Sequence, residues 1–349
     1  MNETKLCNDL DVLMHFIDDS LGIDKEKNNV TGFTLTVPLT ESAAYNSYLE
    51  TISNKTDTIY LRIKESLTEM AKYSYLNYIS RISKKFDWKN KESVLAFDYT
   101  DEDFYGDVQG LDIYGWTGEH GVKGKFKFLT CSIISDDTPQ KIPLISIPIQ
   151  LGHNMSYAVT HCLDLIKPYI GKINLVLFDR GFYSKSLMYD LKKLQIPYLI
   201  FVPKDKFIKA ELNGMKDEEK KIIDKEYVLN RDKNYYKFES QLAFLKQIFN
   251  GELNKSLDWV FATNVEDIEL EDIIGTYKKR WRIETQFRVH DEARIKCKSK
   301  DMKIRYFLFL FEQLLQTLWI CFHKEEVPFK EFIIELAKMS RKWTKTQEA

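Results

Sequence analysis

The sequence predicts an α/β fold, in which a mixed sheet is flanked by helices and follows a helical N-terminal region. Residues up to about Lys85 carry apolar side chains at helical spacing, and from Ser93 the period changes to short apolar runs typical of strands. The order from there is three strands, a helix, a strand, a helix and a strand. This order indicates a sheet with an antiparallel start and parallel additions.

Composition is that of an ordinary globular protein, with 349 residues of which 44% are hydrophobic and 30% charged. The formal net charge is -1, so charge as a whole gives no attraction to nucleic acid. The local distribution is uneven, because residues 277–305 hold eleven Lys or Arg against four Asp or Glu. Residues 98–107 hold five acidic residues and no basic one. Each stretch fits a solvated face, and together they fit a site that holds a metal ion beside a polyanion.

The cysteine pattern and the hydropathy predict a cytoplasmic protein. An odd number of scattered cysteines argues against a disulfide framework or a zinc site; they are Cys7, Cys131, Cys162, Cys297 and Cys321. The first residues lack the basic-then-apolar order of a signal peptide. The most apolar stretch, 306–322, contains Glu312, Gln313 and Gln316, so we expect a buried helix there and no membrane partner.

The N-terminal region, residues 1–90, is predicted to be helical and is a candidate for DNA binding. Helical spacing of apolar residues runs through Asp9–Leu21 and again through Asp57–Ile82. Between them, Gly22–Asn46 reads as a polar loop with a short strand at Gly32–Val37. No helix-turn-helix signature stands out in this region.

The elements that follow are predicted from apolar runs and turn residues. Strands are expected at Val94–Phe97, Lys125–Ser135, Ile142–Leu151, Ile173–Phe178, Pro197–Val202 and Trp259–Thr263, and helices at Ser156–Tyr169, Ser184–Leu194 and Tyr277–Arg288. A catalytic core is expected over residues 91–203 and 259–325. The charged stretch 204–258 is expected to be an insertion subdomain, and 326–349 a C-terminal helical tail.

Three acidic residues form the candidate catalytic site. Asp98 and Asp179 follow apolar strands, and ligands bind where such strands end. Two carboxylates buried together need compensating cations, and Mg²⁺ or Mn²⁺ prefers oxygen ligands. Glu284, on the predicted helix at Tyr277–Arg288, would supply a third carboxylate. Taken singly, each residue could as well be a cap or a turn residue.

These segments resemble those of DDE transposases of the insertion-sequence type. Phe97–Asp101 resembles the first-aspartate segment of that family, and Leu177–Tyr183 resembles the second. The third segment is similar to the Tyr-Arg-Glu-Lys signature of the insertion sequence four family, with Tyr277, Arg280 and Glu284 at the matching positions. The last position of that signature departs, because Asp291 stands where the family has Lys.

The resemblance implies an RNase H-like core with an insertion between the second Asp and the Glu. It implies catalysis and metal binding by Asp98, Asp179 and Glu284, with Mg²⁺ or Mn²⁺ as cofactor, as two ions. The expected activity is DNA cleavage and strand transfer at inverted-repeat ends, often through a hairpin. The expected partner is double-stranded DNA, both element ends and target, bound by a homodimer. A bacterial or archaeal, nucleoid-associated location follows.

The basic residues near the third segment are candidates for DNA contacts. The resemblance places Tyr277 and Arg280 at DNA phosphate near the cleavage point, against an alternative of packing. Arg288 or Arg294 could take over the phosphate contact of the missing Lys. Lys298 is expected to contact the DNA backbone, as are Lys296, Lys300 and Lys303. Trp281 fits either base stacking or a helical core.

Other functions stay open at this point. An RNase H-like nuclease without strand transfer would use the same three carboxylates. A catalytically dead, transposase-derived DNA-binding protein would explain the departure at Asp291. A haloacid-dehalogenase-like phosphatase would use Asp98 and Thr100 as its nucleophile loop, but it would leave Arg280 and Glu284 unexplained.

Overall fold

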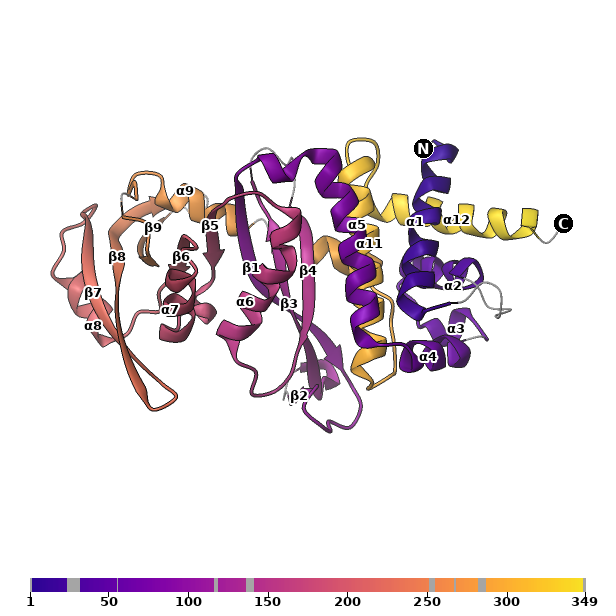
Figure 1. Cartoon of the computed structure of the whole chain (residues 1–349), viewed down its shortest axis with the longest axis horizontal. Helices are drawn as coiled ribbons and strands as arrows, with labels where there is room; N and C mark the ends of the chain where they lie inside the picture. The colour runs from indigo at the N-terminus through magenta and orange to yellow at the C-terminus, as the bar shows by residue number, and fades with distance from the viewer. Residues whose placement is uncertain are drawn as a thin grey trace.

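The structure, a computed structural model, describes residues 2–23, 32–54, 56–115, 119–135, 141–250, 255–266, 268–281 and 287–347. These residues form a nine-stranded mixed sheet with helices packed against it and a helical region at one end (Figure 1). The predicted α/β class, with a mixed sheet and a helical N-terminal region, is therefore confirmed.

One sheet contains all nine described strands, from β1 to β9. Its order is β2-β3-β1-β5-β6-β9-β8-β7, and β4 also pairs with β3. The bounds are β1 Ser93–Phe104, β2 Tyr114–Gly115, β3 Gly124–Ile133, β4 Ile142–Ile149, β5 Ile173–Phe178, β6 Tyr198–Phe201, β7 Lys220–Arg231, β8 Asn234–Asn250 and β9 Lys255–Thr263. Among these pairs, β1 with β5 and β5 with β6 are parallel, and the others are antiparallel.

One sequence expectation about the first strand is wrong. The apolar run Val94–Phe97 was expected to end at Asp98, yet β1 continues to Phe104. Only the parallel pairing with β5 stops at Phe97, while the antiparallel pairing with β3 continues as far as Phe104 and Gly124. The acidic residues after Phe97 therefore belong to a strand, because β3 supplies its hydrogen bonds to the end.

The N-terminal region consists of helices. They are α1 Glu3–Leu21, α2 Gly32–Tyr45, α3 Leu49–Ile52, α4 Thr56–Glu65 and α5 Thr68–Phe86. Asn2 caps α1, because its side-chain oxygen accepts a hydrogen bond from the Thr4 N–H at 2.8 Å. Gly22 ends that helix with φ +58°, a left-handed conformation that suits glycine.

Two predictions in this region are wrong. Gly32–Val37 lies in helix α2 and is not a strand, although Pro38 stands inside the helix. Leu35 and Leu39 are fully buried, and α2 packs mainly on α12, so tertiary packing outweighs the β-like local pattern. The polar loop predicted over Gly22–Asn46 is also wrong, because α2 occupies Gly32–Tyr45. The amphipathic pattern over Asp57–Ile82 does form helices, α4 and α5.

The remaining helices cover the sheet or join it to the N-terminal region. They are α6 Met155–Ile166, α7 Lys185–Lys193, α8 Lys206–Asn213, α9 Ile273–Lys278, α11 Met302–Phe322 and α12 Phe329–Gln347. Short 3₁₀ turns lie at Trp88–Asn90, Glu119–Gly121, Lys167–Tyr169, Arg180–Phe182, Lys279–Trp281 and Asp291–Ala293. The helix predicted at Tyr277–Arg288 begins earlier, in α9, and turns to 3₁₀ geometry at Lys279. Residues 282–286 of that prediction lie outside the described residues.

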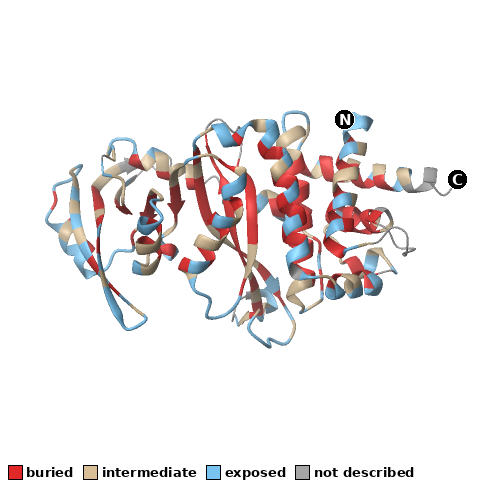
Figure 2. Ribbon diagram, in the orientation of Figure 1, coloured by how far each residue is buried: buried red, intermediate tan, exposed pale blue. Residues whose placement is uncertain are grey.

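Helix α11 joins the two halves of the molecule. It packs on β4 and, together with α5, lies between the sheet and helices α1 to α4 (Figure 1). Residues 304–318 of α11 are all buried, as predicted for this apolar stretch, and Figure 2 shows the buried residues gathered in α5, α11 and the central strands. No described helix has both the length and the apolarity to cross a membrane.

The stretch predicted as an insertion extends the sheet. Strands β7 and β8 form a long hairpin whose turn places Asp232 and Lys233 at positive φ, as a tight hairpin turn requires. Arg231 ties this hairpin to α7 through two hydrogen bonds to Asp190, at 2.8 and 2.9 Å. Strand β8 pairs with β9, which pairs with β6. The predicted domain boundaries themselves stay a prediction.

Candidate active site

Two of the three predicted carboxylates directly follow in-register residues of adjacent parallel strands. Phe97 of β1 is the in-register partner of Phe178 of β5, so Asp98 and Asp179 follow side by side. Because neighbouring strands lie about 4.8 Å apart, the two backbones are in direct proximity here. Both residues are half-buried. Asp98 and Asp179 are called the acidic pair below.

Local backbone hydrogen bonds hold each carboxylate. Oδ1 of Asp98 accepts a hydrogen bond from the Tyr99 N–H at 2.8 Å. Asp179 leaves β5 in an extended conformation and caps the 3₁₀ turn at Arg180–Phe182, where its Oδ1 accepts from the Gly181 N–H at 2.8 Å. Such Asx contacts fix the side chain of an aspartate relative to its own backbone. The orientation of both carboxylates is therefore set locally.

An aromatic stack supports the acidic pair from the opposite face of the sheet. Phe97 and Phe178 stack with ring centroids 5.4 Å apart, and Tyr99 stacks on Phe182 at 4.9 Å. Phe178 and Phe182 are 5.3 Å apart, so the four rings are continuous. Successive side chains of a strand point to opposite faces, which places Phe97 and Tyr99 away from Asp98. The sequence analysis did not identify this stack, although Phe182 lies in the segment that carries the family resemblance.

Arg280 is a partner of the acidic pair. Its Nη1 lies 3.2 Å from Oδ2 of Asp98, and its Nε donates to the Tyr277 hydroxyl at 3.2 Å. Burial alone would lower the pKa of Arg280, but Tyr277, Asp98 and Asp179 raise it, and the net shift is upward. The guanidinium is thus held charged next to the pair.

Tyr277 holds Arg280 from within an aromatic cluster. Its side chain is 1% exposed and contacts the rings of Phe261, Phe201 and Trp259. Burial raises the pKa of Tyr277 to about 12; Arg280 opposes the rise, and the carboxylates of the acidic pair add to it. The hydroxyl therefore stays protonated at neutral pH and is available as the acceptor for Arg280.

The residues predicted to contact DNA fall into two groups. Tyr277 and Arg280 face inward, at 1% and 4% exposure, and their contacts here are with protein groups. A DNA contact by either stays a prediction. Arg288 and Lys298 are exposed, and Arg294 is half-buried with its Nη2 2.7 Å from Oδ1 of Asp291. Asp291, which stands at the Lys position of the family signature, is thus paired with a local cation.

The third predicted ligand, Glu284, lies outside the described residues, as does the side chain of Trp281. The next described residue, Phe287, packs against the same apolar cluster as Tyr277. The described residues hold no group of three or more His, Cys, Asp or Glu placed for a metal ion. The acidic pair supplies two carboxylates with oxygen donors, which is the ligand chemistry that Mg²⁺ and Mn²⁺ prefer. The donor set fits such an ion and needs further oxygen ligands.

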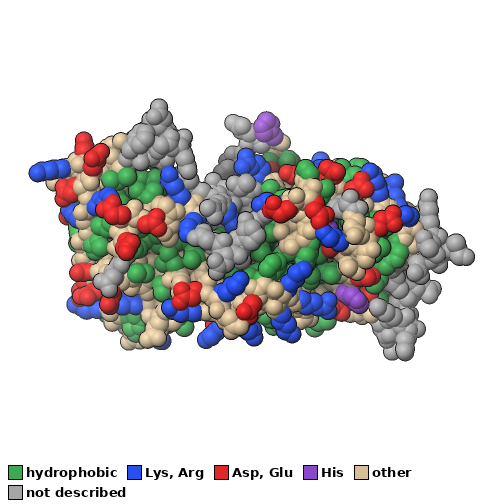
Figure 3. All heavy atoms as spheres, turned by 90° about the horizontal axis from the view of Figure 1, so that it is seen from above, with side chains coloured by type: hydrophobic (Ala, Val, Ile, Leu, Met, Phe, Trp, Pro, Cys, Tyr) green, Lys and Arg blue, Asp and Glu red, His purple; other side chains and the backbone are tan. Residues whose placement is uncertain are grey.

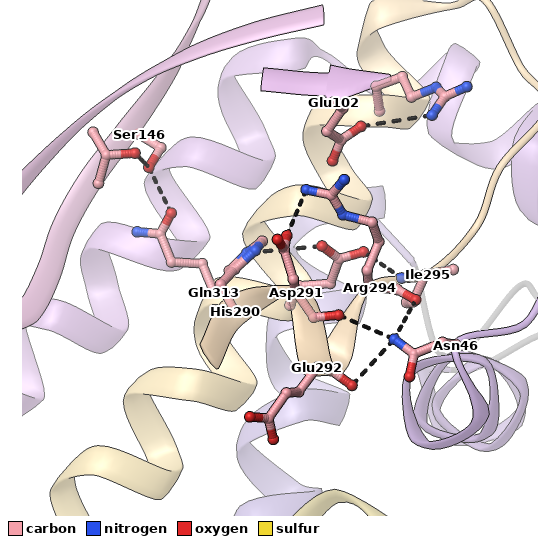
Figure 4. A network of polar contacts seen from close by, with 12 residues as sticks. Asn46, Glu102, Ser146, His290, Asp291, Glu292, Arg294, Ile295 and Gln313 are labelled. Atoms are coloured by element: carbon pink, nitrogen blue, oxygen red, sulfur yellow. Dashed lines mark hydrogen bonds and ion pairs between the residues drawn. The ribbon is translucent and has the colours of Figure 1, made fainter. Parts of the chain in front are cut away.

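A second polar cluster lies farther along β1 (Figure 4). Glu102 was expected in a solvated acidic loop, but it is 6% exposed and its Oε2 lies 3.6 Å from Nη1 of Arg305. Arg305 comes from α11, about 200 residues later in the chain, so local sequence could not show this pairing. The other acidic residues of that stretch agree better with the prediction, since Asp103 and Asp107 are exposed and Asp101 pairs with Lys125 at 3.3 Å.

Glu312 and His290 complete this cluster. Glu312, on α11, accepts the Ile295 N–H at 2.7 Å, and its other oxygen lies 3.7 Å from Nε2 of His290. Burial raises the pKa of Glu312 well above its usual value and lowers that of His290 to about 3. The sequence predicted only a buried apolar helix for α11 and no site at His290. The cluster fixes the segment 290–295 against β1 and α11.

Charge on the outer surface is mixed. On the face shown in Figure 3, Lys and Arg side chains alternate with Asp and Glu side chains and do not gather into a single field. This agrees with the net charge of -1. Any attraction for a polyanion must therefore arise locally.

Comparisons with known proteins show which family the chain belongs to. Residues 108–315 match the family model described as the transposase DDE domain. The solved structure of a piggyBac transposase synaptic complex with hairpin DNA is similar, with a TM-score of 0.57 over 97% of this chain and 79% of that chain. Sequence identity there is 11%, so that likeness bears on the fold alone. No curated protein matches the sequence.

The fold comparison confirms the predicted class, an RNase H-like mixed sheet flanked by helices. The family match spans well over half of the chain and includes Asp179, while Asp98 lies ten residues before its start. The finer assignment to the insertion sequence four family rests on the signature residues alone. By its match to the family model, the chain belongs to the transposase DDE domain family.

Proposed function

We propose that the protein is a metal-dependent transposase that cleaves DNA at the inverted-repeat ends of an insertion sequence and joins the 3′-hydroxyl to target DNA. The observation that carries this proposal is the acidic pair: Asp98 and Asp179 directly follow Phe97 and Phe178, the last in-register partners of the parallel pairing of β1 and β5. In this reading Glu284 is the third carboxylate of the site. Cleavage without strand transfer is the nearest alternative.

The acidic pair and Glu284 would hold two Mg²⁺ or Mn²⁺ ions. When bound, such ions polarise the phosphate and stabilise charge on the attacking and leaving oxygens. The protein groups orient the ligands: the Tyr99 and Gly181 N–H groups each fix one carboxylate. Arg280 compensates negative charge at Asp98, at an Nη1 to Oδ2 distance of 3.2 Å. Because Arg280 occupies one oxygen of Asp98, we expect it to shift when cations and DNA phosphate enter.

Double-stranded DNA is the proposed partner, with Arg288, Arg294 and Lys298 as backbone contacts. Arg288 and Lys298 are exposed, whereas Arg294 would have to share its charge with Asp291. The similar solved structure is a synaptic complex with hairpin DNA. By analogy we propose that this chain also acts on paired ends, as a homodimer, and through a hairpin. A nucleoid location would follow from such a substrate.

The test is cleavage of a DNA fragment that carries the element ends, with Mg²⁺ or Mn²⁺. We expect Asp98→Asn, Asp179→Asn and Glu284→Gln each to lower the cleavage rate at least a hundredfold while DNA binding is retained. Asp205→Asn is a matched control, because Asp205 caps α8 and has no part in the proposed site. Cleavage by any of the three variants at the control rate would remove that residue from the site.

Strand transfer is tested separately with a pre-cleaved end and a target plasmid. Joined products in the presence of the metal ion would support a transposase. Cleavage without joined products would support the nuclease alternative. Binding to the ends with neither activity in the wild type would support a catalytically dead DNA-binding protein.

A further inference from the structure

In segment 294–300 basic residues alternate with Ile295, Cys297 and Ser299, and the backbone is extended at Arg294 and at Lys296, which forms a parallel bridge with Tyr48. Arg294, Lys296, Lys298 and Lys300 are half-buried or exposed, while Ile295 and Cys297 are buried. In an extended chain residues two apart share a face and are about 6.6–6.8 Å apart. The four cations therefore line one side of the segment. They are called the basic ladder below.

The backbone of the basic ladder is held on both sides. Lys296 donates its N–H to the Ser47 carbonyl at 3.1 Å and accepts the Leu49 N–H at 3.2 Å, so it is paired with the N-terminal region. On the other side, Arg305 donates to the carbonyls of Cys297 at 2.6 Å and Ser299 at 2.9 Å. A segment fixed in this way loses little conformational entropy when its side chains bind a ligand.

Three members of the basic ladder, Arg294, Lys296 and Lys298, line one side of a groove. The groove has a volume of about 560 Å³ and is lined by Tyr48, Glu102, Asp103, Phe104, Tyr105, Gly106, Arg294, Ile295, Lys296, Cys297, Lys298 and Arg305. Four of these residues are basic and two are acidic, and Glu102 is already paired with Arg305. Arg294 is paired with Asp291, so the surplus of positive charge in the groove comes from Lys296 and Lys298 against Asp103.

Two tyrosine rings, of Tyr48 and Tyr105, line the groove beside the lysines. The ammonium groups of Lys296 and Lys298 lie 5.9 and 5.4 Å from the ring centroid of Tyr48. Tyr105 lines the groove at the end of β1 and is 55% exposed. Proteins bind single-stranded nucleic acid by combining two features. Basic side chains contact the phosphates along the strand, and exposed aromatic rings stack on its bases. The volume of the groove lies within the range of small-ligand pockets, which is large enough for nucleotides of one strand.

The groove lies in line with the acidic pair. Glu102 to Phe104 follow Asp98 on the same strand, four to six residues on, which is roughly 13–20 Å at the rise of a β-strand. That span equals about four to six base-pair steps of duplex DNA at 3.4 Å each, and fewer steps of a separated, extended strand. A strand cut at the acidic pair would reach the groove within a few nucleotides of the cut.

We propose that this groove binds an unpaired DNA strand near the cleavage point, with its phosphates on Lys296 and Lys298 and a base stacked on Tyr105. This inference rests on the proposed function, because it takes DNA opened near the cut as the ligand. It adds a site for one separated strand to the duplex contacts proposed above.

The experiment measures the affinity of the full-length protein for a labelled twelve-nucleotide thymidine strand and for a twelve-base-pair duplex, at several salt concentrations. The variants are Lys296→Ala/Lys298→Ala, Tyr105→Ala and Tyr105→Phe. Matched controls are Lys206→Ala/Lys209→Ala, two exposed lysines of α8, and Tyr235→Ala, a tyrosine 75% exposed at the β7–β8 hairpin. Circular dichroism checks that each variant is folded.

We expect Tyr105→Ala to weaken binding of the single strand roughly tenfold, with Tyr105→Phe close to wild type, because the ring supplies the stacking. The double lysine variant should weaken it further and reduce the salt slope by about 1.4, since each phosphate contact to a single strand contributes about 0.7. The affinity for duplex should change less than twofold with Tyr105→Ala.

Three results would overturn the inference. Tyr105→Ala and the double lysine variant could bind the single strand as the wild type does. Tyr105→Ala could also weaken single strand and duplex equally, which would mark an ordinary duplex surface. In either case cleavage of element ends by the wild type would leave the proposed function intact. Failure of the wild type to bind any DNA or to cleave would instead remove both.

Discussion

Phe97 and Phe178 are in-register partners on the parallel strands β1 and β5, and their rings stack 5.4 Å apart at an interplanar angle of 12°. Each of them directly precedes one member of the acidic pair. The residues that directly precede Asp98 and Asp179 are therefore fixed to each other by a strand register and a buried ring contact. A site supported by such elements holds its geometry better than one built on loops.

Replacement of Phe182 should test how far this aromatic support matters. Phe182 is 1% exposed and contacts the rings of Tyr99 and Phe178. We expect Phe182→Ala to lower the free energy of unfolding by roughly 3–5 kcal/mol, because a buried ring is lost and a cavity remains. Denaturant unfolding followed by circular dichroism measures this. Phe207→Ala, at 39% exposure, is the control and should cost less than about 1 kcal/mol; equal losses would contradict the argument.

The contact of Arg280 with Asp98 leads to a second prediction. The side chains are 5% and 18% exposed, so removal of the cation leaves a partly buried carboxylate without it. We expect Arg280→Gln to lower the free energy of unfolding by about 2–4 kcal/mol, somewhat less than for a fully buried pair. In an Asp98→Asn background the same change should cost at least 1 kcal/mol less, about the coupling energy of neighbours. A double-mutant cycle with the same cost in both backgrounds would show that the two residues are not coupled.

Much of the central sheet could be predicted from sequence because its strands are short apolar runs with polar ends. The predicted strand Ile173–Phe178 coincides with β5, and the residue after it is Asp179. Since β5 is buried in the centre of the sheet, its pattern does not depend on a particular partner. The side-by-side position of Asp98 and Asp179 followed from the same reasoning, and the register of β1 with β5 agrees with it.

The wrong predictions concern residues whose environment is made by distant parts of the chain. Gly32–Val37 has the β-branched pattern of a strand, but α12, near the end of the chain, covers it as helix α2. From its local sequence Glu102 is predicted to be a surface residue, but in the fold it is paired with Arg305 of α11. Sequence periodicity reports on local conformation and average burial, and it carries no information about which distant side chain pairs with which.

The Tyr277 hydroxyl gives a third prediction, about activity. It accepts a hydrogen bond from Nε of Arg280 at 3.2 Å. Tyr277→Phe keeps the packed ring and should lower the free energy of unfolding by only about 1 kcal/mol. It should also slow DNA cleavage, because Arg280 is less well oriented toward Asp98. Tyr198→Phe is the matched control, since it loses a buried hydroxyl contact to Ser240 at 2.9 Å away from the acidic pair. Equal cleavage rates in the two variants would show that the Tyr277 hydroxyl has no role in the site.

His290 gives the fourth prediction, a dependence of stability on pH. Burial, and to a lesser extent Arg294, lower its pKa to about 3, from about 6.5 in the unfolded chain. Between these values the unfolded chain binds a proton that the folded protein does not, so stability rises with pH up to about 6.5 and falls on acidification.

His290→Phe should remove this contribution, because the new ring can keep the contact with Phe309, whose centroid lies 4.7 Å from that of His290. Between pH 6.5 and 4.5 the slope of unfolding free energy against pH should fall by up to about 1.4 kcal/mol per unit relative to the wild type. At pH 7 to 8 the two curves should run parallel. Glu312, which lies 3.7 Å from His290, is present in both proteins, so its raised pKa largely cancels in the difference. Parallel curves down to pH 4.5 would show that His290 is protonated in the folded protein as readily as in the unfolded chain.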